Sequence, residues 1–387
     1  WPSLAAAITD PDNHPKYHSS VKEPLPIGKE SVVSREKWGS RTITLLVSVA
    51  VTLSILGIAF LLPVPFIKLA PGPTFNVIGE VDGSPVIQIS GTETFPTSGD
   101  LDMTTVRESG GPRGGLTFVD AVGSWFDASD ALVPRELVYP DDVSGEDVKA
   151  RNAALFSTSE SNSVAAALNY LDLPVQTRVV ATAVIVGAPA DEVFLPRDEI
   201  LSIDAVEVAS PSDVVEAVQG SRVGTEFTIE IRRMSEDKTV TVVSGENPDA
   251  PDKPYLGISV GKLYSAEFDI NFTLSDVGGP SAGLMFATGI VDKLTPADLT
   301  GGGHVAGTGT ITPEGEVGPI GGIRQKLGGA SSAGAKLFLM PEQHCAEAQG
   351  HIPDGLTVTP VTSLADALKE LGHWVAGIAV TSCPATP

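Results

Sequence analysis

One stretch of the chain carries no charged side chain from Thr42 to Ile67, and its core, Ile43 to Leu62, is predominantly apolar. A helix needs about 20 such residues to cross the hydrocarbon core of a bilayer. A buried helix of a soluble domain would show a polar face, which this stretch lacks. A cleaved signal peptide would have an apolar region of only about 7–15 residues behind a short basic start. The stretch therefore predicts a transmembrane helix over residues 42–67.

The charges that flank this span predict its orientation. Lys68 is the only basic residue close behind the span, whereas several lie shortly before it, among them Lys29, Arg35, Lys37 and Arg41. Because basic residues concentrate on the cytoplasmic side, we expect residues 1–41 in the cytoplasm and everything after the span outside the cell membrane. The polar residues 1–41 show no sustained period, which predicts a disordered tail.

The composition argues against several classes of binding partner. The 387 residues leave room for two or three domains, and the net charge of −23 argues against a nucleic-acid partner. The sequence contains no Gly-x4-Gly-Lys-Ser/Thr phosphate loop, so we predict no nucleotide site. No metal-ligand motif occurs either, and we expect no cofactor. Cys345 and Cys383 are the only cysteines, and both a disulfide and two free thiols are compatible with them.

The segment Asp276 to Gly283 has the features of a reactive loop. It contains Gly278 and Gly279 and leads into the apolar run Leu284–Leu294, which has the length and spacing of a buried helix. Ser281 therefore lies where a glycine-rich loop becomes a helix. Unpaired backbone N–H groups at such a junction stabilise a developing oxyanion. We expect this oxyanion site at Gly279, Pro280 and Ala282.

A serine hydroxyl needs a base within hydrogen-bond reach before it can act as a nucleophile. Lys326 shares a helical face with apolar side chains, those of Ile323, Leu327 and Ala330. A lysine in a dry interior has a lowered pKa, and a shift from about 10.4 to about 7 costs roughly 4–5 kcal/mol. We infer a Ser281–Lys326 dyad for acyl transfer.

The same residues allow two other interpretations. The pattern Gly279-x-Ser281-x-Gly283 also fits the nucleophile elbow of α/β-hydrolases, for which a histidine would come from His304, His344, His351 or His373. That elbow should follow an apolar strand directly, and here a polar, glycine-containing stretch intervenes. A helix-capping serine and a surface lysine would explain Ser281 but not a lysine on an apolar face.

Two sequence blocks resemble the proteolytic domain of the Lon family. They are Gly279-Pro280-Ser281-Ala282-Gly283 and the run from Gly307 to Lys326, which includes Gly321-Gly322-Ile323-Arg324-Gln325-Lys326. With the predicted membrane span, the chain looks most like the membrane-anchored, PDZ-containing Lon-like proteases of bacteria. The resemblance implies that Ser281 is the nucleophile, Lys326 the general base and Thr308 a residue that supports the lysine. It also implies assembly into a homo-oligomer, and the missing phosphate loop implies proteolysis without ATP.

A second module is predicted over residues 173–245. Its β-branched runs surround a helix that should begin at Ser210-Pro211-Ser212-Asp213, with serine as cap and proline in the first position. The module is similar to a bacterial PDZ domain in Gly187–Ala190 and Asp198–Asp204. A PDZ domain binds an extended chain end at a sheet edge. Ala205 stands where a glycine is common, so both peptide binding and a structural shield over the active site are compatible with this sequence.

The predicted architecture is multidomain. Residues 68–172 form a small β-rich and helical connecting region, residues 246–254 a linker, and residues 255–373 an α/β Lon-type proteolytic domain, followed by a tail over 374–387. We expect a serine endopeptidase that acts on peptides or proteins outside the cytoplasmic membrane. The alternative is a non-catalytic, membrane-anchored PDZ scaffold that binds peptides.

Overall fold

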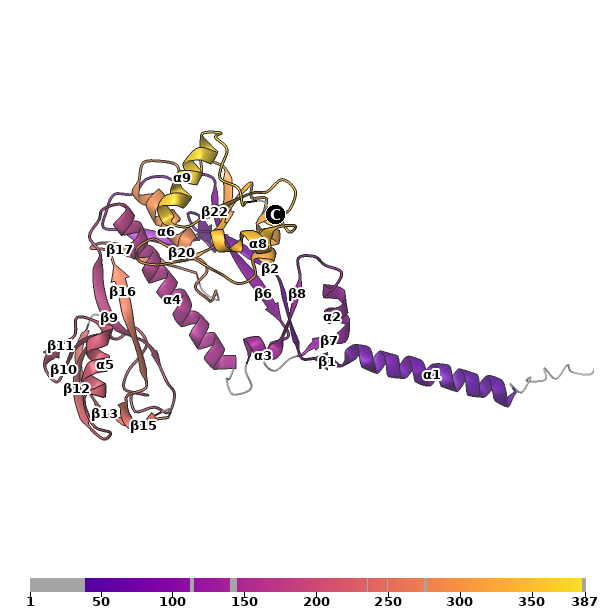
Figure 1. Ribbon diagram of the computed structural model, residues 1–387, viewed down its shortest axis with the longest axis horizontal. Coiled ribbons are helices and arrows are strands. Elements are labelled where there is room, and N and C mark those ends of the chain that lie inside the picture. Colours follow the sequence, from indigo (N-terminus) through magenta and orange to yellow (C-terminus); the bar gives the residue numbers. More distant parts are fainter. Residues whose placement is uncertain are drawn as a thin grey trace, which may run out of the picture. The chain divides into compact units, whose positions relative to one another are not determined.

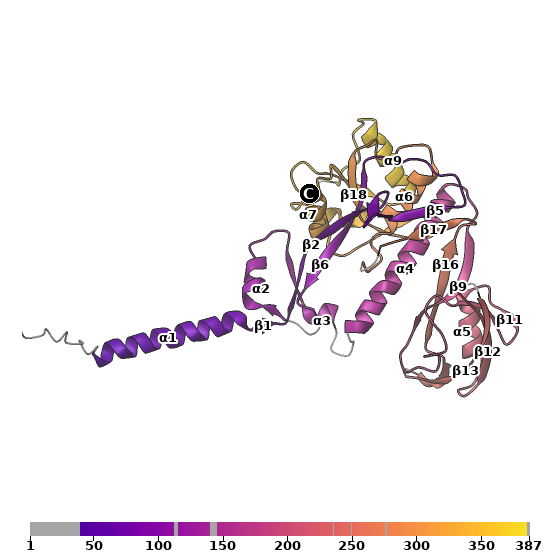
Figure 2. The ribbon, with the colours of Figure 1, turned by 180° about the vertical axis from the view of Figure 1, so that it is seen from behind.

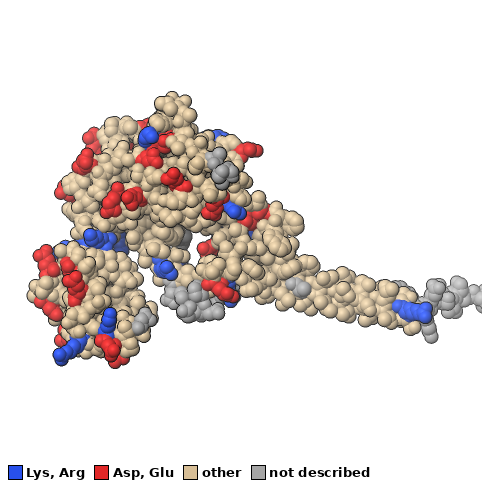
Figure 3. All heavy atoms as spheres, in the orientation of Figure 1, with Lys and Arg blue, Asp and Glu red and all other residues tan. Residues whose placement is uncertain are grey.

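The computed structural model describes residues 39–111, 115–139, 145–234, 236–248, 250–274 and 277–384. Helix α1 spans Ser40–Leu61, and its stretch Ser40–Ile58 is long and apolar enough to cross a membrane. Space filling shows α1 almost free of charged side chains (Figure 3). The predicted span ran on to residue 67, but the helix ends at Leu61 because Pro63 and Pro65 follow. Nearly all of the predicted tail, residues 1–38, lies outside the described part.

A six-stranded sheet forms the centre of the largest domain (Figure 1). Its order is β22 (Thr357–Val361), β21 (Leu337–Pro341), β18 (His304–Gly307), β6 (Asp100–Ser109), β2 (Phe66–Asn76) and β8 (Ala131–Pro134). The first four strands run parallel, whereas β2 is antiparallel to both of its neighbours.

Three strands of this sheet, β2, β6 and β8, come from residues expected to form a separate connecting region. Instead β6 lies directly beside β18, with Leu101 opposite Val305 and both side chains buried. The first part of the chain after α1 is thus built into the central sheet. Strand composition was visible in the sequence, but the partner of β6 lies some two hundred residues away and has no local signature.

Helices cover both faces of the sheet, as Figures 1 and 2 show from opposite sides. Leu337 and Leu339 of β21 face a core shared with α4 (Gly145–Tyr170), α6 (Gly283–Leu294) and α9 (Leu364–Val375). The alternate residues Phe338 and Met340 face a second core with α7 (Ile323–Ala333) and α8 (Cys345–Ala348). This alternation follows from the two-residue period of a strand and requires a sheet that is buried on both sides.

Short elements complete this domain. The paired strands are β1 (Pro63–Val64) with β7 (Leu116–Thr117), β3 (Glu80–Val81) with β4 (Ser84–Pro85), β5 (Ile87–Ser90) with β17 (Asp269–Phe272), and β19 (Thr310–Ile311) with β20 (Val317–Gly318). The short helices are α2 (Phe118–Ser124), α3 (Arg135–Val138) and the 3-10 helix η1 (Glu342–His344).

The second module has its own sheet and core. Its strand order is β13 (Glu236–Val243), β12 (Glu226–Arg233), β10 (Glu199–Ile203), β9 (Gln176–Val184) and β16 (Ile258–Ser265), with β11 (Val206–Glu207) beside β10. Helix α5 (Pro211–Gln219) begins with the expected serine cap, Ser210, and Asp213 completes a capping box. β-branched side chains, including Ile229 and Ile231, form much of the core.

Two boundaries of this module differ from the sequence expectation. Strand β16 was assigned to residues 255–373, but it pairs with β9 and forms an edge of the PDZ-like sheet. The expected linker over 246–254 contains a hairpin of β14 (Gly245–Asn247) and β15 (Ala250–Tyr255). Strand β16 looks like an isolated strand locally, because its partner β9 lies far earlier in the chain.

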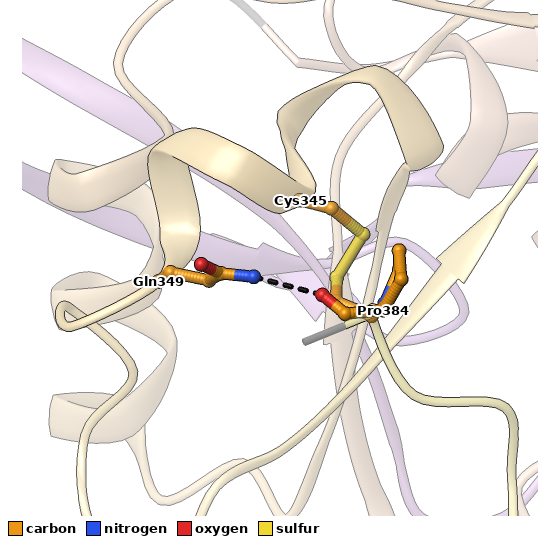
Figure 4. Close-up of a disulfide and its surroundings, with 4 residues drawn as sticks. Cys345, Gln349 and Pro384 are labelled. Atoms are coloured by element: carbon orange, nitrogen blue, oxygen red, sulfur yellow. Dashed lines mark hydrogen bonds between the residues drawn. A yellow bond between two sulfur atoms is a disulfide. The ribbon is translucent and has the colours of Figure 1, made fainter. Parts of the chain in front are cut away.

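The C-terminal segment is bonded to the domain that contains the six-stranded sheet. Cys345 and Cys383 form a disulfide, and Gln349 Nε2 donates to the carbonyl oxygen of Pro384 over 2.8 Å (Figure 4). Helix α9 continues to Val375, and the backbone N–H of Thr381 donates to Glu370. Residues expected to form a free tail are therefore fixed as far as Pro384.

Candidate active site

Ser281 lies in the turn that leads into α6, as the sequence predicted. Gly279 has a φ of +87°, which favours glycine, and α6 begins two residues after the serine, at Gly283. A side chain at Gly283 would place its Cβ only 2.8 Å from Ile311 Cγ2. The Ser281 carbonyl oxygen accepts from the N–H of Gly309 at 2.9 Å, so the β18–β19 connection holds the serine in place.

Lys326 reaches this serine from α7. Its Nζ lies 2.7 Å from Ser281 Oγ and 2.8 Å from Thr308 Oγ1, and the residue is only 2% exposed. The glycine before α7, Gly322, adopts a left-handed conformation with a φ of +72°. Ile323 and Leu327, which share the predicted face, are fully buried. Burial lowers the pKa of Lys326 to about 7, because desolvation penalises the ammonium form.

Thr308 connects the other two side chains. It is fully buried, and its Oγ1 donates to the Ser281 carbonyl oxygen at 3.1 Å while accepting from Lys326 Nζ. A hydroxyl has one proton and two lone pairs, so both contacts can exist together. The three residues expected to cooperate, which are 45 positions apart at most in sequence, therefore lie in direct contact.

Helix α4 binds the loop before Ser281. The sequence did not predict this contact. The N–H of Gly279 donates to the Asn152 carbonyl oxygen at 2.9 Å, and Ser159 Oγ donates to the Pro280 carbonyl oxygen at 3.0 Å. Helix α4 is continuous through the serine-rich stretch around Ser159. These hydroxyls have partners, such as Pro280 for Ser159 and the Tyr264 N–H for Ser161, so they do not break the helix.

The backbone groups expected to form the oxyanion site differ in their hydrogen bonding. The N–H of Gly279 is already bonded to Asn152, and Pro280 has no N–H to donate. The backbone N–H groups of Ser281 and Ala282 are the ones that have no acceptor within the described chain. Asp276, at the start of the predicted reactive loop, lies outside the described residues.

A cleft of about 700 Å³ gives access to the Ser281 and Lys326 side chains. Its walls are formed by the Met103–Glu108 stretch of β6, the 277–282 loop and residues 319–321. Among the described residues that line this cleft there is no histidine. His304 instead contacts Asp102 at 2.9 Å, and His344 Nε2 accepts from the Ile320 N–H. The arrangement disfavours a serine–histidine hydrolase.

Comparison with known proteins agrees with this architecture. A model of the Lon protease (S16) C-terminal proteolytic domain matches residues 275–372, and a PDZ domain model matches residues 155–243. The Lon protease of Lachnoclostridium phytofermentans is 32% identical over 186 residues, which cover 42% of this chain and 23% of that protein. The Lon protease of Azospirillum brasilense is 42% identical over 95 residues, which cover 24% of this chain and 12% of that protein.

The chain thus spans less than a quarter of the length of these curated relatives. Among solved structures, the PDZ domain of an SdrC-like protein from Listeria monocytogenes is 19% identical and covers 21% of this chain and 86% of that chain, with a TM-score of 0.20. The chain therefore combines a proteolytic domain of the Lon serine-protease family with a PDZ domain, behind one helix long and apolar enough to cross a membrane.

Proposed function

We propose that the protein is an ATP-independent serine endopeptidase in which Ser281 and Lys326 form the catalytic dyad. The observation that carries this proposal is the 2.7 Å contact between a buried lysine amine and the serine hydroxyl. With its pKa lowered to about 7, Lys326 is unprotonated in a large share of molecules at neutral pH. An uncharged amine beside a hydroxyl is what a general base requires.

The reaction divides into two acyl-transfer steps. Ser281 Oγ forms a bond to the scissile carbonyl carbon while its proton moves to Lys326 Nζ. The carbonyl oxygen becomes an oxyanion that the N–H groups of Ser281 and Ala282 stabilise. The C–N bond then breaks, the ammonium of Lys326 returns the proton to the leaving amine, and water hydrolyses the acyl-enzyme with Lys326 again as base.

Thr308 acts on this chemistry through its neighbours. Its hydroxyl fixes Nζ of Lys326 on one side and the Ser281 backbone on the other, so the amine cannot rotate away from Oγ. The class of substrate is a peptide or protein, which the cleft along β6 can hold in extended form. ATP independence is supported by the lack of a phosphate loop in these 387 residues.

We place the active site outside the cytoplasmic membrane. The basic residues that precede α1, including Arg41, support an N-terminus on the cytoplasmic side. The disulfide between Cys345 and Cys383 adds independent support, because such bonds persist in oxidising compartments. Assembly into a homo-oligomer remains a proposal that rests on the family resemblance alone.

The PDZ-like module offers a second peptide site. A groove lies between Val214 and Val218 of α5 and Ile258 and Val260 of β16. Because β16 is an edge strand, its outer side can pair with an extended chain. The resemblance to a PDZ domain was based on Gly187–Ala190 and Asp198–Asp204 and did not include Gly257, which lines this groove and has a φ of +82°.

The full chain in detergent micelles tests the proposal. We expect it to cleave a fluorogenic unfolded protein equally well with and without ATP. Ser281→Ala and Lys326→Ala should each reduce turnover by at least about 10³-fold, since neither half of a dyad functions alone. The matched controls Ser332→Ala and Lys336→Ala, both at exposed positions, should keep wild-type rates.

A serine-directed fluorophosphonate probe separates the enzyme from the alternative of a non-catalytic scaffold. Labelling of the wild-type chain that disappears in Ser281→Ala supports the dyad. An unlabelled chain that still binds peptides through the α5–β16 groove would instead establish the scaffold.

A further inference from the structure

The surface next to the end of α1 carries a group of exposed apolar side chains. We define the juxtamembrane patch as Phe66, Phe118, Val119, Trp125, Phe126 and Leu137. Trp125 is 83% exposed, Phe126 87% and Leu137 76%. Large apolar side chains in such a group seldom face water without a partner, and they mark a surface that contacts another protein or a membrane.

Backbone hydrogen bonds tie this patch to the residues that leave α1. The N–H of Phe118 donates to the Leu62 carbonyl oxygen at 3.1 Å, and the N–H of Arg135 donates to the Pro65 carbonyl oxygen at 3.0 Å. The strands β1 and β7 pair between these two contacts, and the ring of Phe118 lies 6.0 Å from that of Phe60 in the last turn of α1. Figure 1 shows α2 and α3 beside β1.

These contacts indicate at which depth relative to the membrane the juxtamembrane patch lies. Residues 60–65 follow the candidate span Ser40–Ile58 directly, so they lie at the level where hydrocarbon gives way to lipid headgroups. Anything bonded to Leu62 and Pro65 lies within the same interfacial layer. Helix α2 has seven residues and is about 10 Å long, which places Trp125 close to that layer as well. Tryptophan is enriched at this depth because its ring is apolar and its N–H is polar.

We propose that the juxtamembrane patch inserts into the lipid interface on the side of the membrane that holds the catalytic domain. The proposal rests on the membrane anchoring given above. It identifies a lipid-binding surface separate from the transmembrane helix, built from α2, α3 and their flanking residues. Because β2 and β8 continue from the same segments into the central sheet, insertion would hold the catalytic domain at the membrane surface.

Tryptophan fluorescence tests the insertion in the full chain. Trp1→Phe and Trp38→Phe leave two of the four tryptophans, Trp125 and Trp374. This variant is reconstituted into phosphatidylcholine–phosphatidylglycerol vesicles with and without bromine atoms on the acyl chains near the headgroup. We expect bromine to reduce the emission toward half, and further substitution of Trp125→Phe to abolish the loss. Equal emission in both kinds of vesicle overturns the proposal.

A second label removes any dependence on tryptophan. Because Cys345 and Cys383 are joined, a Phe126→Cys variant has one free thiol for an environment-sensitive nitrobenzoxadiazole label. The matched control is Met234→Cys, a site 91% exposed in the hairpin between β12 and β13. We expect the label at 126 to gain several-fold in emission in vesicles and to resist aqueous iodide, with no such change at 234.

The outcomes distinguish failure of the patch proposal from failure of the membrane anchoring by α1. Failure of the protein to float with vesicles would overturn both the anchoring and the patch. Flotation with a label at 126 that iodide quenches as strongly as at 234 would overturn the patch alone. A label at 126 that resists iodide, together with Trp125 emission that bromine does not reduce, would mean that protein, not lipid, covers the patch, and would also overturn the proposal. None of these measurements depends on proteolytic activity.

Discussion

Ser159 Oγ in the middle of α4 donates a hydrogen bond to the carbonyl oxygen of Pro280, the residue immediately before Ser281. The two residues are 121 positions apart in the chain. Together with the bond from the Gly279 N–H to Asn152, this contact fixes the loop that presents the serine. Helix α4 therefore positions the loop that carries Ser281.

Ser159→Ala should lower kcat while leaving the fold intact. The lost hydrogen bond is worth about 1 kcal/mol, and a serine that is less well placed reacts about 5–10-fold more slowly. The control is Thr158→Ala on the exposed side of the same helix, which should have the wild-type kcat. Steady-state kinetics together with a melting curve check the prediction. Unchanged kcat in Ser159→Ala would show that the Ser159 hydroxyl has no part in positioning the loop.

Activity should rise with pH through about 7. Below that pH, Lys326 is protonated and cannot accept the Ser281 proton, so kcat/KM should fall about tenfold per unit and level off above it. Burial also raises the pKa of Glu160 in α4 to about 7, so Glu160→Gln is the matched control and should keep the same pH profile. Measurement of kcat/KM from about pH 5 to about pH 9 checks this. A profile without an acid limb would exclude a lysine base.

The same burial should make Lys326 destabilising. Its pKa is about 7 in the folded chain and 10.5 for an exposed lysine, so the unfolded chain binds more protons between these pH values. The free energy of unfolding therefore rises with pH across that window. At pH 7 and below, the buried lysine makes it about 4–5 kcal/mol smaller than it is above the pKa of an exposed lysine.

Lys326→Met removes the free-energy cost of burying the amine and nearly conserves side-chain volume. We expect the free energy of unfolding at pH 7 to increase by roughly 2–4 kcal/mol, less than the full amount because Ser281 and Thr308 lose a partner. Denaturant titrations at pH 7 and pH 9 measure it, with the exposed Lys336→Met as control. A Lys326→Met chain that is less stable than wild type would show that the amine is not desolvated.

Local features of the site could be predicted from the sequence. The expected helix over 284–294 is α6, which begins one residue earlier, and the apolar face of α7 correctly placed Lys326 in the interior. Both rest on short-range rules, the helical period and the turn-forming property of glycine. Two such elements next to one sheet bring Ser281 and Lys326 into contact.

Long-range pairing could not be predicted in this way. Strand β6 looks like any other strand, and nothing near it in sequence shows that it pairs with β18 or forms a wall of the cleft. The role of Asn152 depends on its carbonyl oxygen, a group that every residue has, so no residue type marks it. The hydrogen bond of the Gly279 N–H could not be predicted either, because its acceptor lies in the distant helix α4.

Thr308→Val should separate positioning of the amine from burial of the amine. Valine has nearly the same shape as threonine but removes the hydroxyl that touches both Lys326 Nζ and the Ser281 carbonyl oxygen. We expect kcat to fall about 5–30-fold, since the loss of two hydrogen bonds of about 1 kcal/mol each loosens the dyad. The acid limb should also move to lower pH, because a hydroxyl that accepts from the ammonium form favours that form.

The matched control is Thr359→Val in β22. Thr359 is likewise fully buried, but its Oγ1 has no hydrogen-bond partner within the described part of the chain. Its replacement should therefore leave kcat and the pH profile unchanged and should not lower the melting temperature, because an unsatisfied buried hydroxyl is removed. If Thr308→Val and Thr359→Val have the same kcat, the hydroxyl of Thr308 has no part in catalysis, and burial alone sets the reactivity of Lys326.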